Sequence, residues 1–188
     1  MTKPVKPGRP RSPGLSFFSP RVILPGALVL GVLAVSPVFR MFVVETVPDR
    51  RVVFLRPFAP GYEFFLSYTH SVNKSEIIDR FGLREDGSVI LRGSRFLSFG
   101  AGVATEDAGT FSGTDRFLEY RGMDRELPDL RVFIGGEADH RYASRDGSFR
   151  FLDRVAPRTG LSFHVRRVSP VEMISYRARK GVLHETGD

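Results

Sequence analysis

The sequence of 188 residues contains no cysteine and no tryptophan. Without cysteine the chain cannot form a disulfide, a thiolate nucleophile, or a zinc or iron–sulfur site of the cysteine type. The missing disulfides do not identify the compartment, because a domain that is large enough to bury its own core does not need them. Hydrophobic residues make up 41% of the chain, which is enough for such a core.

The chain also lacks the basic folded domain that is typical of nucleic-acid-binding proteins. Its net charge is +7, but much of this charge lies in the first 21 residues, which contain five cations and no acidic residue. These cations are Lys3, Lys6, Arg9, Arg11 and Arg21. From Met41 onward the chain carries 22 basic and 21 acidic residues, with both signs interspersed. Because a nucleic-acid binder concentrates cations on a face of its folded domain, we expect no nucleic-acid partner.

An uncharged apolar run follows the basic tail. Residues 1–21 are rich in proline and show no hydrophobic period, so we expect a flexible tail. Residues 22–39 contain no charge and span about 27 Å as a helix, just short of a hydrocarbon core of about 30 Å. The apolar residues up to 44 extend the run, so we predict one N-terminal transmembrane helix at 22–44. A cleaved signal segment and a buried core helix are the alternatives.

The charges around this run predict its orientation in the membrane. Basic segments stay on the cytoplasmic side, so the tail is expected in the cytoplasm. The chain would then be a single-pass protein of the inner (cytoplasmic) membrane. Residues 45–188 would form a β-rich extracytoplasmic domain in the periplasm. The lipid membrane is therefore the first expected partner.

After residue 45 the apolar residues recur with a period of two rather than 3.6, which predicts strands. Asp86-Gly87 and Asp146-Gly147 have the composition of tight turns. Short strands at this spacing predict an all-β fold, an antiparallel β-sandwich or barrel-like domain. The predicted strands cover 51–55, 62–70, 75–83, 88–93, 95–99, 116–121, 130–134, 138–143, 161–168 and 172–177, with a helical turn at 149–155.

The stretch SYTHSVNKSEI concentrates polar groups that carry chemistry in other proteins. His70 and Ser71 are neighbours on or beside a strand and would point to opposite faces, which disfavours a Ser–His hydrolase. A metal site formed by His70, Glu76 and the distant His140 lacks the spacing of known ligand motifs. The favoured interpretation is a hairpin in which Tyr68 lies in the core and His70 bonds to the backbone or to Glu76.

A second candidate site combines a glycine loop with an arginine. Phe99, Gly100 and Gly102 lie in SFGAGV, where two glycines one residue apart can direct N–H groups toward an anion. Such glycines more often mark a bulge. Arg125 can bind a carboxylate through two hydrogen bonds, or it can pair with its acidic neighbours. His140 lies on a predicted strand, where a single histidine is usually structural.

Four blocks of sequence carry a resemblance to a known family. In chain order, the blocks are YTHSV with Glu76 six residues after its histidine, FLSFGAGV, RGMDRELPDLRVFIG and ADHRY. Together they resemble the bacterial domain-of-unknown-function family numbered 1850 (DUF1850), over roughly residues 52–168. Members are small anchored or exported β-rich proteins, often encoded beside TRAP-type transporters of the TAXI kind. The resemblance implies a periplasmic accessory to solute uptake, and it assigns no catalytic residue, metal or cofactor.

We therefore expect a membrane-anchored accessory or binding protein rather than an enzyme, with a TRAP transporter permease or its solute-binding protein as partner. A metal-assisted hydrolase that uses His70, Glu76 and His140 is the alternative. A third hypothesis is direct binding of an anionic metabolite at Arg125 and the glycine loop. The candidate binding residues are Tyr68, His70, Ser71, Glu76, Phe99, Gly100, Gly102, Arg125 and His140.

Overall fold

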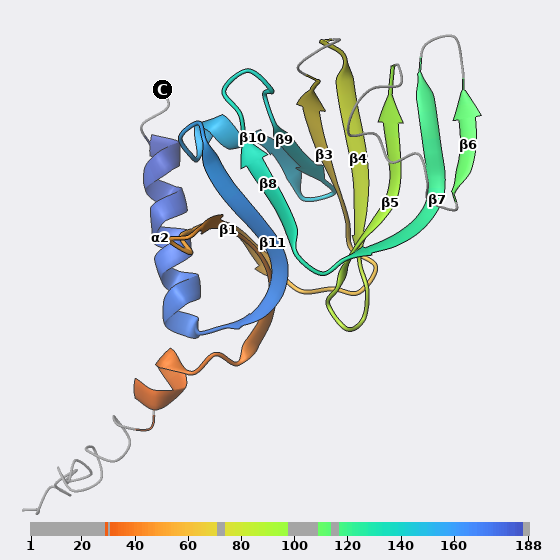
Figure 1. Cartoon of the computed structure of the whole chain (residues 1–188). Coiled ribbons are helices and arrows are strands. Elements are labelled where there is room, and N and C mark those ends of the chain that lie inside the picture. Colours follow the sequence, from red (N-terminus) through yellow and green to blue (C-terminus); the bar gives the residue numbers. More distant parts are fainter. Residues whose placement is uncertain (1–28, 30, 71–73, 98–108, 114–116, 186–188) are drawn as a thin grey trace, which may run out of the picture.

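Strands dominate the computed structural model of the chain, which describes residues 29, 31–70, 74–97, 109–113 and 117–185. The strands form two antiparallel sheets with separate strand orders, so the fold is a sandwich rather than a closed barrel (Figure 1). The prediction of an antiparallel, mostly β fold is confirmed.

The small sheet has four strands, and every neighbouring pair is antiparallel. In their order across the sheet, the strands are β2 (Val52–Pro57), β1 (Phe39–Val47), β11 (Thr159–Val168) and β8 (Leu130–Ile134). The first and last strands that the structure describes are therefore neighbours, since β1 pairs with β11, which directly precedes the C-terminal helix. This pairing ties the first strand to the rest of the domain.

The large sheet has seven strands. In order, they are β10 (Gly147–Arg150), β9 (Arg141–Ser144), β3 (Glu63–Thr69), β4 (Glu76–Leu83), β5 (Val89–Phe96), β7 (Leu118–Leu127) and β6 (Thr110–Gly113). A tight turn joins β4 to β5, as the sequence predicted, with Gly87 at φ +96°. The predicted turn at Gly147 joins β9 to β10, with φ +123°. Both positive φ angles favour glycine.

Aromatic side chains from both sheets fill the space between them. The ring of Phe64 on β3 lies 5.0 Å from that of Phe42 and 5.9 Å from that of Phe163, both on the small sheet. The same ring stacks on Phe81 at 5.2 Å and on Tyr142 at 5.7 Å. All five residues are buried. Each such aromatic pair adds about 0.5–1.5 kcal/mol to the hydrophobic term, so Phe64 is the centre of the core.

The predicted transmembrane segment ends too late in the sequence, because β1 begins at Phe39. Phe42 and Val44 are fully buried in the core between the sheets. Met41 and Val43 point to the other face of the small sheet, where they pack with residues of the last helix. A strand that is covered on both faces has no polar alternation, so its sequence resembles the end of an apolar helix. Residues 39–44 therefore belong to the folded domain.

The predicted strand at 172–177 is wrong, because this segment lies in helix α2 (Pro170–Glu185). Ser169 precedes the helix, and its hydroxyl accepts a hydrogen bond from the backbone N–H of Glu172 at 3.3 Å. Proline suits the first helical position, and Ser followed three residues later by Glu is the sequence pattern of a helix start. The predicted helical turn at 149–155 is confirmed by the short helix η1 (Phe151–Asp153).

The basic tail at 1–21 and residues 22–28 lie outside the described residues. Residues 31–35 are helical and project from the sandwich next to β1 (Figure 1). Within the part of the chain that the structure describes, no helix combines the length and the apolar character that crossing a bilayer requires.

Candidate functional site

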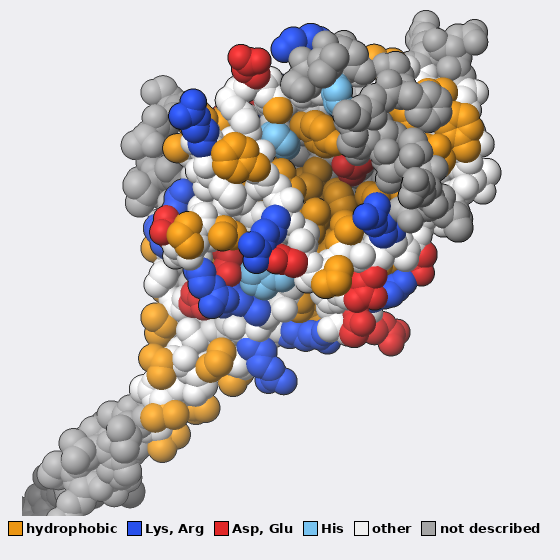
Figure 2. Space-filling model, viewed as in Figure 1, with side chains coloured by type: hydrophobic (Ala, Val, Ile, Leu, Met, Phe, Trp, Pro, Cys, Tyr) orange, Lys and Arg blue, Asp and Glu red, His pale blue; other side chains and the backbone are white. Residues whose placement is uncertain are grey.

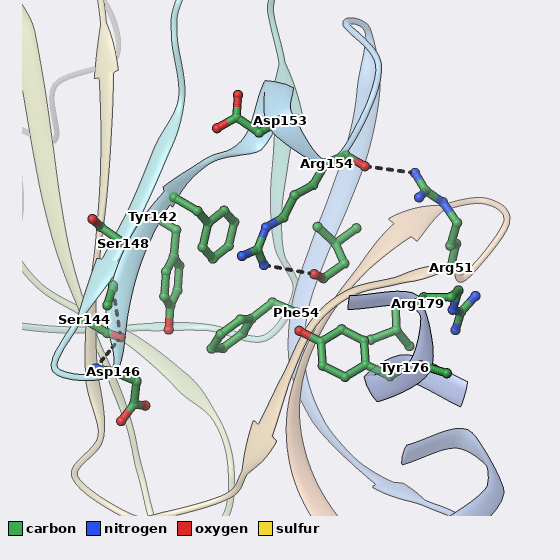
Figure 3. Close-up of a pocket in the computed structure, with 15 residues that line it drawn as sticks. Arg51, Phe54, Tyr142, Ser144, Asp146, Ser148, Asp153, Arg154, Tyr176 and Arg179 are labelled. Atoms are coloured by element: carbon green, nitrogen blue, oxygen red, sulfur yellow. Dashed lines mark hydrogen bonds between the residues drawn. The ribbon is translucent and has the colours of Figure 1, made fainter. Parts of the chain in front are cut away.

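A cavity of about 860 Å³ lies where the edge of each sheet meets helix α2 (Figure 3). Strand β2 at the edge of the small sheet forms one wall, and the β9–β10 hairpin at the edge of the large sheet forms another. Helices η1 and α2 contribute the remaining lining residues. This volume falls in the range of small-molecule sites, about 300–1,000 Å³.

Four aromatic rings from four elements surround the cavity. They are Phe54 of β2, Tyr142 of β9, Phe149 of β10 and Tyr176 of α2 (Figure 3). The ring of Phe54 lies 4.9 Å from that of Tyr142 and 5.8 Å from that of Phe149, so three of the rings form a continuous wall. Such a wall presents flat apolar surface to a ligand without ordering many flexible side chains.

The hydroxyl of Tyr142 is a fixed polar group at this wall. It lies 2.8 Å from the hydroxyl of Tyr62, with which it shares a buried hydrogen bond. Burial and this hydrogen bond raise the pKa of Tyr142 far above its usual range. The tyrosine therefore stays neutral at physiological pH and contributes no charge to the cavity.

Three arginines supply the cations that line the cavity: Arg51, Arg154 and Arg179. The guanidinium of Arg154 lies 3.5 Å from the centre of the Phe149 ring, and its Nη1 donates a hydrogen bond to the carbonyl of Val53 at 3.3 Å. Burial lowers the pKa of Arg154 below its usual value. Figure 3 shows this guanidinium directed toward the middle of the site, between the aromatic rings.

Two of the sequence-predicted site residues come together. The rings of Tyr68 and His140 stack with their centres 5.3 Å apart. Burial, with a smaller effect of Asp79, raises the pKa of Tyr68 to about 12. Burial also lowers the pKa of His140, against the opposing effect of Asp139. Nδ1 of His140 is buried and has no hydrogen-bond partner in the described structure.

Of the remaining candidates, the structure describes His70, Glu76 and Arg125. Arg125 lies on β7, and β4 and β5 separate that strand from Tyr68 on β3. His70 closes the turn between β3 and β4 through its backbone, since its N–H donates to the carbonyl of Ser75 at 2.8 Å. The other four candidates, Ser71, Phe99, Gly100 and Gly102, lie outside the described residues.

The metal site proposed for the hydrolase is wrong. All three of its residues are described, and the described residues contain no group of three or more His, Cys, Asp or Glu that could hold a metal ion. Glu76 is the cross-strand partner of Thr69 on β3. His140 stacks on Tyr68, which directly precedes Thr69 on that strand. Successive strand residues point to opposite faces, so Glu76 and His140 lie on different sides of the sheet.

A half-buried carboxylate on the inner face of the large sheet was not among the site residues predicted from the sequence. Asp79 on β4 accepts a hydrogen bond of 2.6 Å from the hydroxyl of Ser94 on β5. Burial raises the pKa of Asp79, and this hydrogen bond opposes the rise. The sequence did carry a signal, because Asp79 alternates with the apolar residues Ile77 and Phe81 on one strand face.

A serine, a histidine and a glutamate also line up on the outer face of the small sheet. The hydroxyl of Ser162 lies 3.1 Å from Nδ1 of His164, whose Nε2 lies 3.4 Å from Glu45. Glu45 is also bound by Arg50 at 3.1 Å and by Arg166 at 3.2 Å. In a catalytic triad the glutamate charge would stabilise the protonated histidine. Here the two arginines already compensate that charge. We assign this group to an ion-pair network that connects the sheet with α2, not to catalysis.

Residues 64–151 match the family described as "Domain of unknown function (DUF1850)", which confirms the resemblance seen in the sequence. The matched stretch runs from β3 to the start of η1 and includes Tyr142 and Phe149 of the cavity wall. No curated protein and no solved structure matches the chain.

Proposed function

We propose that this chain, whose residues 64–151 match the DUF1850 family, is a membrane-anchored periplasmic accessory protein that binds a small organic solute. The cavity between β2, the β9–β10 hairpin and α2 is the observation that carries the proposal. It has the volume of a ligand site, and aromatic rings from four separate elements converge on it. Binding pockets of this kind place a few polar groups in a mostly apolar wall.

An exposed apolar segment supports the membrane anchor. Val32, Leu33 and Val35 are each at least 55% exposed on the helical residues 31–35. Figure 2 shows hydrophobic side chains covering the segment that leads away from the charged body. Such a surface is unfavourable in water, and contact with lipid removes the penalty. The anchor we propose therefore occupies residues 22–38 and ends where β1 begins.

The partner that we propose is a TRAP-type (TAXI) uptake system, through its permease or its solute-binding protein. This part of the proposal rests on the family resemblance. It predicts that the full chain co-purifies from detergent with one of these proteins, and that deletion of the gene lowers solute uptake. Clean purification of the chain by itself together with unchanged uptake contradicts the partnership.

Ligand binding is tested by filling the cavity with a side chain. Ala178 lines the cavity from α2, so Ala178→Trp places a large side chain at the site. The probe is anilinonaphthalene sulfonate, whose fluorescence rises in an apolar site. We expect saturable one-to-one binding to the full chain in detergent, and loss of that binding in Ala178→Trp.

Ser175→Trp is the matched control for this experiment. Ser175 lies on the same helix, is exposed and does not line the cavity. The control introduces the same side chain into the same helix and should keep the binding of the parent. Equal binding of the dye to both tryptophan variants would place its site elsewhere and contradict the proposal.

The membrane topology is tested with reporter fusions. Alkaline phosphatase fused after Asp188 should be active, because that enzyme matures only outside the cytoplasm, and the fusion should remain in the membrane fraction. A fusion with deletion of residues 22–38 should be inactive and soluble. An inactive full-length fusion contradicts the periplasmic location.

A further inference from the structure

The three arginines at the cavity differ from most arginines of the two sheets in their partners. On the sheets, arginines meet carboxylates at short distances, as Arg80 does with Glu63 at 2.7 Å and Arg131 with Asp129 at 2.6 Å. In the part of the chain that the structure describes, no carboxylate lies within 4 Å of the guanidinium nitrogens of the cavity arginines Arg51, Arg154 and Arg179.

We propose that the solute bound in the cavity is an organic carboxylate with an aromatic or branched apolar body, that Arg154 binds its carboxylate, and that Arg179 adds positive charge on the α2 side of the cavity. This inference rests on the proposed function and names the ligand class of the same cavity. A guanidinium presents its N–H donors in a planar fork that matches both oxygens of a carboxylate. The aromatic wall provides the apolar surface for the rest of the ligand.

Arg154 has free donors and a fixed orientation. Its stacking on Phe149 at 3.5 Å holds the plane of the guanidinium, and the carbonyl of Val53 takes a hydrogen bond from Nη1. A guanidinium has five N–H donors, so donors of Arg154 remain for a ligand after those that Val53 and Tyr176 take. A half-buried cation without a counter-ion is unfavourable. A bound anion removes this penalty, which favours anionic ligands over neutral ones of the same shape.

The described acidic residues near the cavity form no ion pair with these cations, and Asp153 acts on Arg154, and Glu172 on Arg179, only at longer range. Asp146 forms an ion pair at 3.3 Å with Nε of Arg56, which is not one of the three cavity arginines. Asp153 is exposed, and its carboxylate points away from the guanidinium of Arg154 in Figure 3. Arg51 precedes β2 and donates a hydrogen bond to the carbonyl of Arg154 at 3.5 Å, and Arg179 lines the cavity from α2. The positive charge is therefore concentrated where β2 and η1 meet α2.

The test compares 4-phenylbutyrate with its neutral amide, 4-phenylbutyramide, by calorimetric titration of the full chain in detergent. The two compounds share the aromatic body and differ in charge. We expect the acid to bind at least tenfold more tightly, because hydrogen bonds to a charged group are stronger than neutral ones. Arg179→Gln should lower the affinity for the acid by about fivefold to tenfold and leave that for the amide unchanged.

Arg177→Gln is the matched control, because Arg177 lies on the same helix, is exposed and does not line the cavity. It removes the same charge and should change neither affinity. Arg154→Gln should reduce the affinity for the acid further. If that variant fails to fold, Arg179→Gln still decides the question, since its side chain is at the surface.

The outcomes separate the ligand class from the proposed function. Equal affinities for acid and amide, both lost in Ala178→Trp, overturn the carboxylate assignment and leave a binding cavity. Equal losses in Arg177→Gln and Arg179→Gln also overturn it, because they indicate a general effect of net charge. No binding of either compound overturns the ligand class, and an additional failure of the dye experiment overturns the proposed function.

Discussion

Arg166 on the outer face of the small sheet and Arg154 at the cavity are both half-buried and both lie near α2, but their partners differ. Arg166 binds Glu45 at 3.2 Å and Glu172 on α2 through two nitrogens. The hydrogen bond with Glu172 raises the pKa of Arg166. Arg154 meets the Phe149 ring, the carbonyl of Val53 and the side chain of Tyr176, and burial lowers its pKa against the opposing effects of Tyr176 and Asp153.

This difference separates a structural cation from one that is available to a ligand. The network around Arg166 connects β1, β11 and α2, so the folded chain itself compensates the charge of Arg166, although its Nε is buried without a hydrogen-bond partner in the described structure. The charge of Arg154 is compensated less well by the folded chain. Two histidines differ in the same way, because Nδ1 of His164 has Ser162 as a partner and Nδ1 of His140 has none in the described structure.

The largest expected effect is the difference in protein stability between substitutions of Arg166 and Arg154. Arg166→Met should lower the free energy of unfolding by about 3 kcal/mol, because it leaves the buried Glu45 with less compensation. Arg154→Met should cost about 1 kcal/mol or less, because the loss of one hydrogen bond and one cation–π contact is offset by removal of a half-buried cation that has no ion pair in the described structure. Chemical denaturation monitored by circular dichroism measures both values.

Arg167→Met is the control, because Arg167 is exposed on the same strand as Arg166. A surface substitution of this kind should change the stability by no more than about 0.5 kcal/mol. The proposed division of roles fails if Arg154→Met destabilises the protein as much as Arg166→Met does.

A smaller effect is expected at the start of α2. This helix carries Glu172, which binds Arg166, and also residues that line the cavity. Ser169→Ala removes the side-chain acceptor of the Glu172 N–H and should cost about 1 kcal/mol. The first turn of α2 should then exchange its amide hydrogens faster, while the strands of the large sheet keep their protection. Uniform loss of protection across both sheets would show that the helix is not a separate unit of stability.

The smallest effect concerns pH and the unpartnered histidine. Burial lowers the pKa of His140 in the folded state below the value of 6.5 for an unperturbed side chain. Its contribution to stability is therefore complete above about pH 6.5 and is lost as the pH falls toward the folded pKa. His140→Gln should lose less stability than the parent between pH 7 and pH 5. Parallel pH curves for the two proteins contradict this assignment.

The sequence predicted best the strands that bury one face. In β3, Phe64 and Leu66 alternate with more exposed residues, and this period of two identifies the strand without knowledge of the fold. The turn at Gly87 was also predictable, because its positive φ favours glycine. These features depend on a few neighbouring residues, so they can be recognised from a short window of the sequence.

The features that escaped prediction depend on parts of the chain that are distant in sequence. The burial of β1 on both faces requires the large sheet on one side and α2 on the other. The cavity combines side chains from β2, β9, β10, η1 and α2, so no single stretch of sequence contains its pattern. Helix α2 was the exception, because Ser169, Pro170 and Glu172 form a recognisable helix start.

The most direct measurement follows the arginine Nε–Hε resonances of the full chain by heteronuclear NMR during a titration with 4-phenylbutyrate. The Arg154 resonance should shift in proportion to occupancy, because its guanidinium faces the cavity and binds the carboxylate. The Arg166 resonance should stay in place, because its carboxylate partners are already present in the folded chain. An unchanged Arg154 resonance at saturation, or equal shifts of both resonances, contradicts the account.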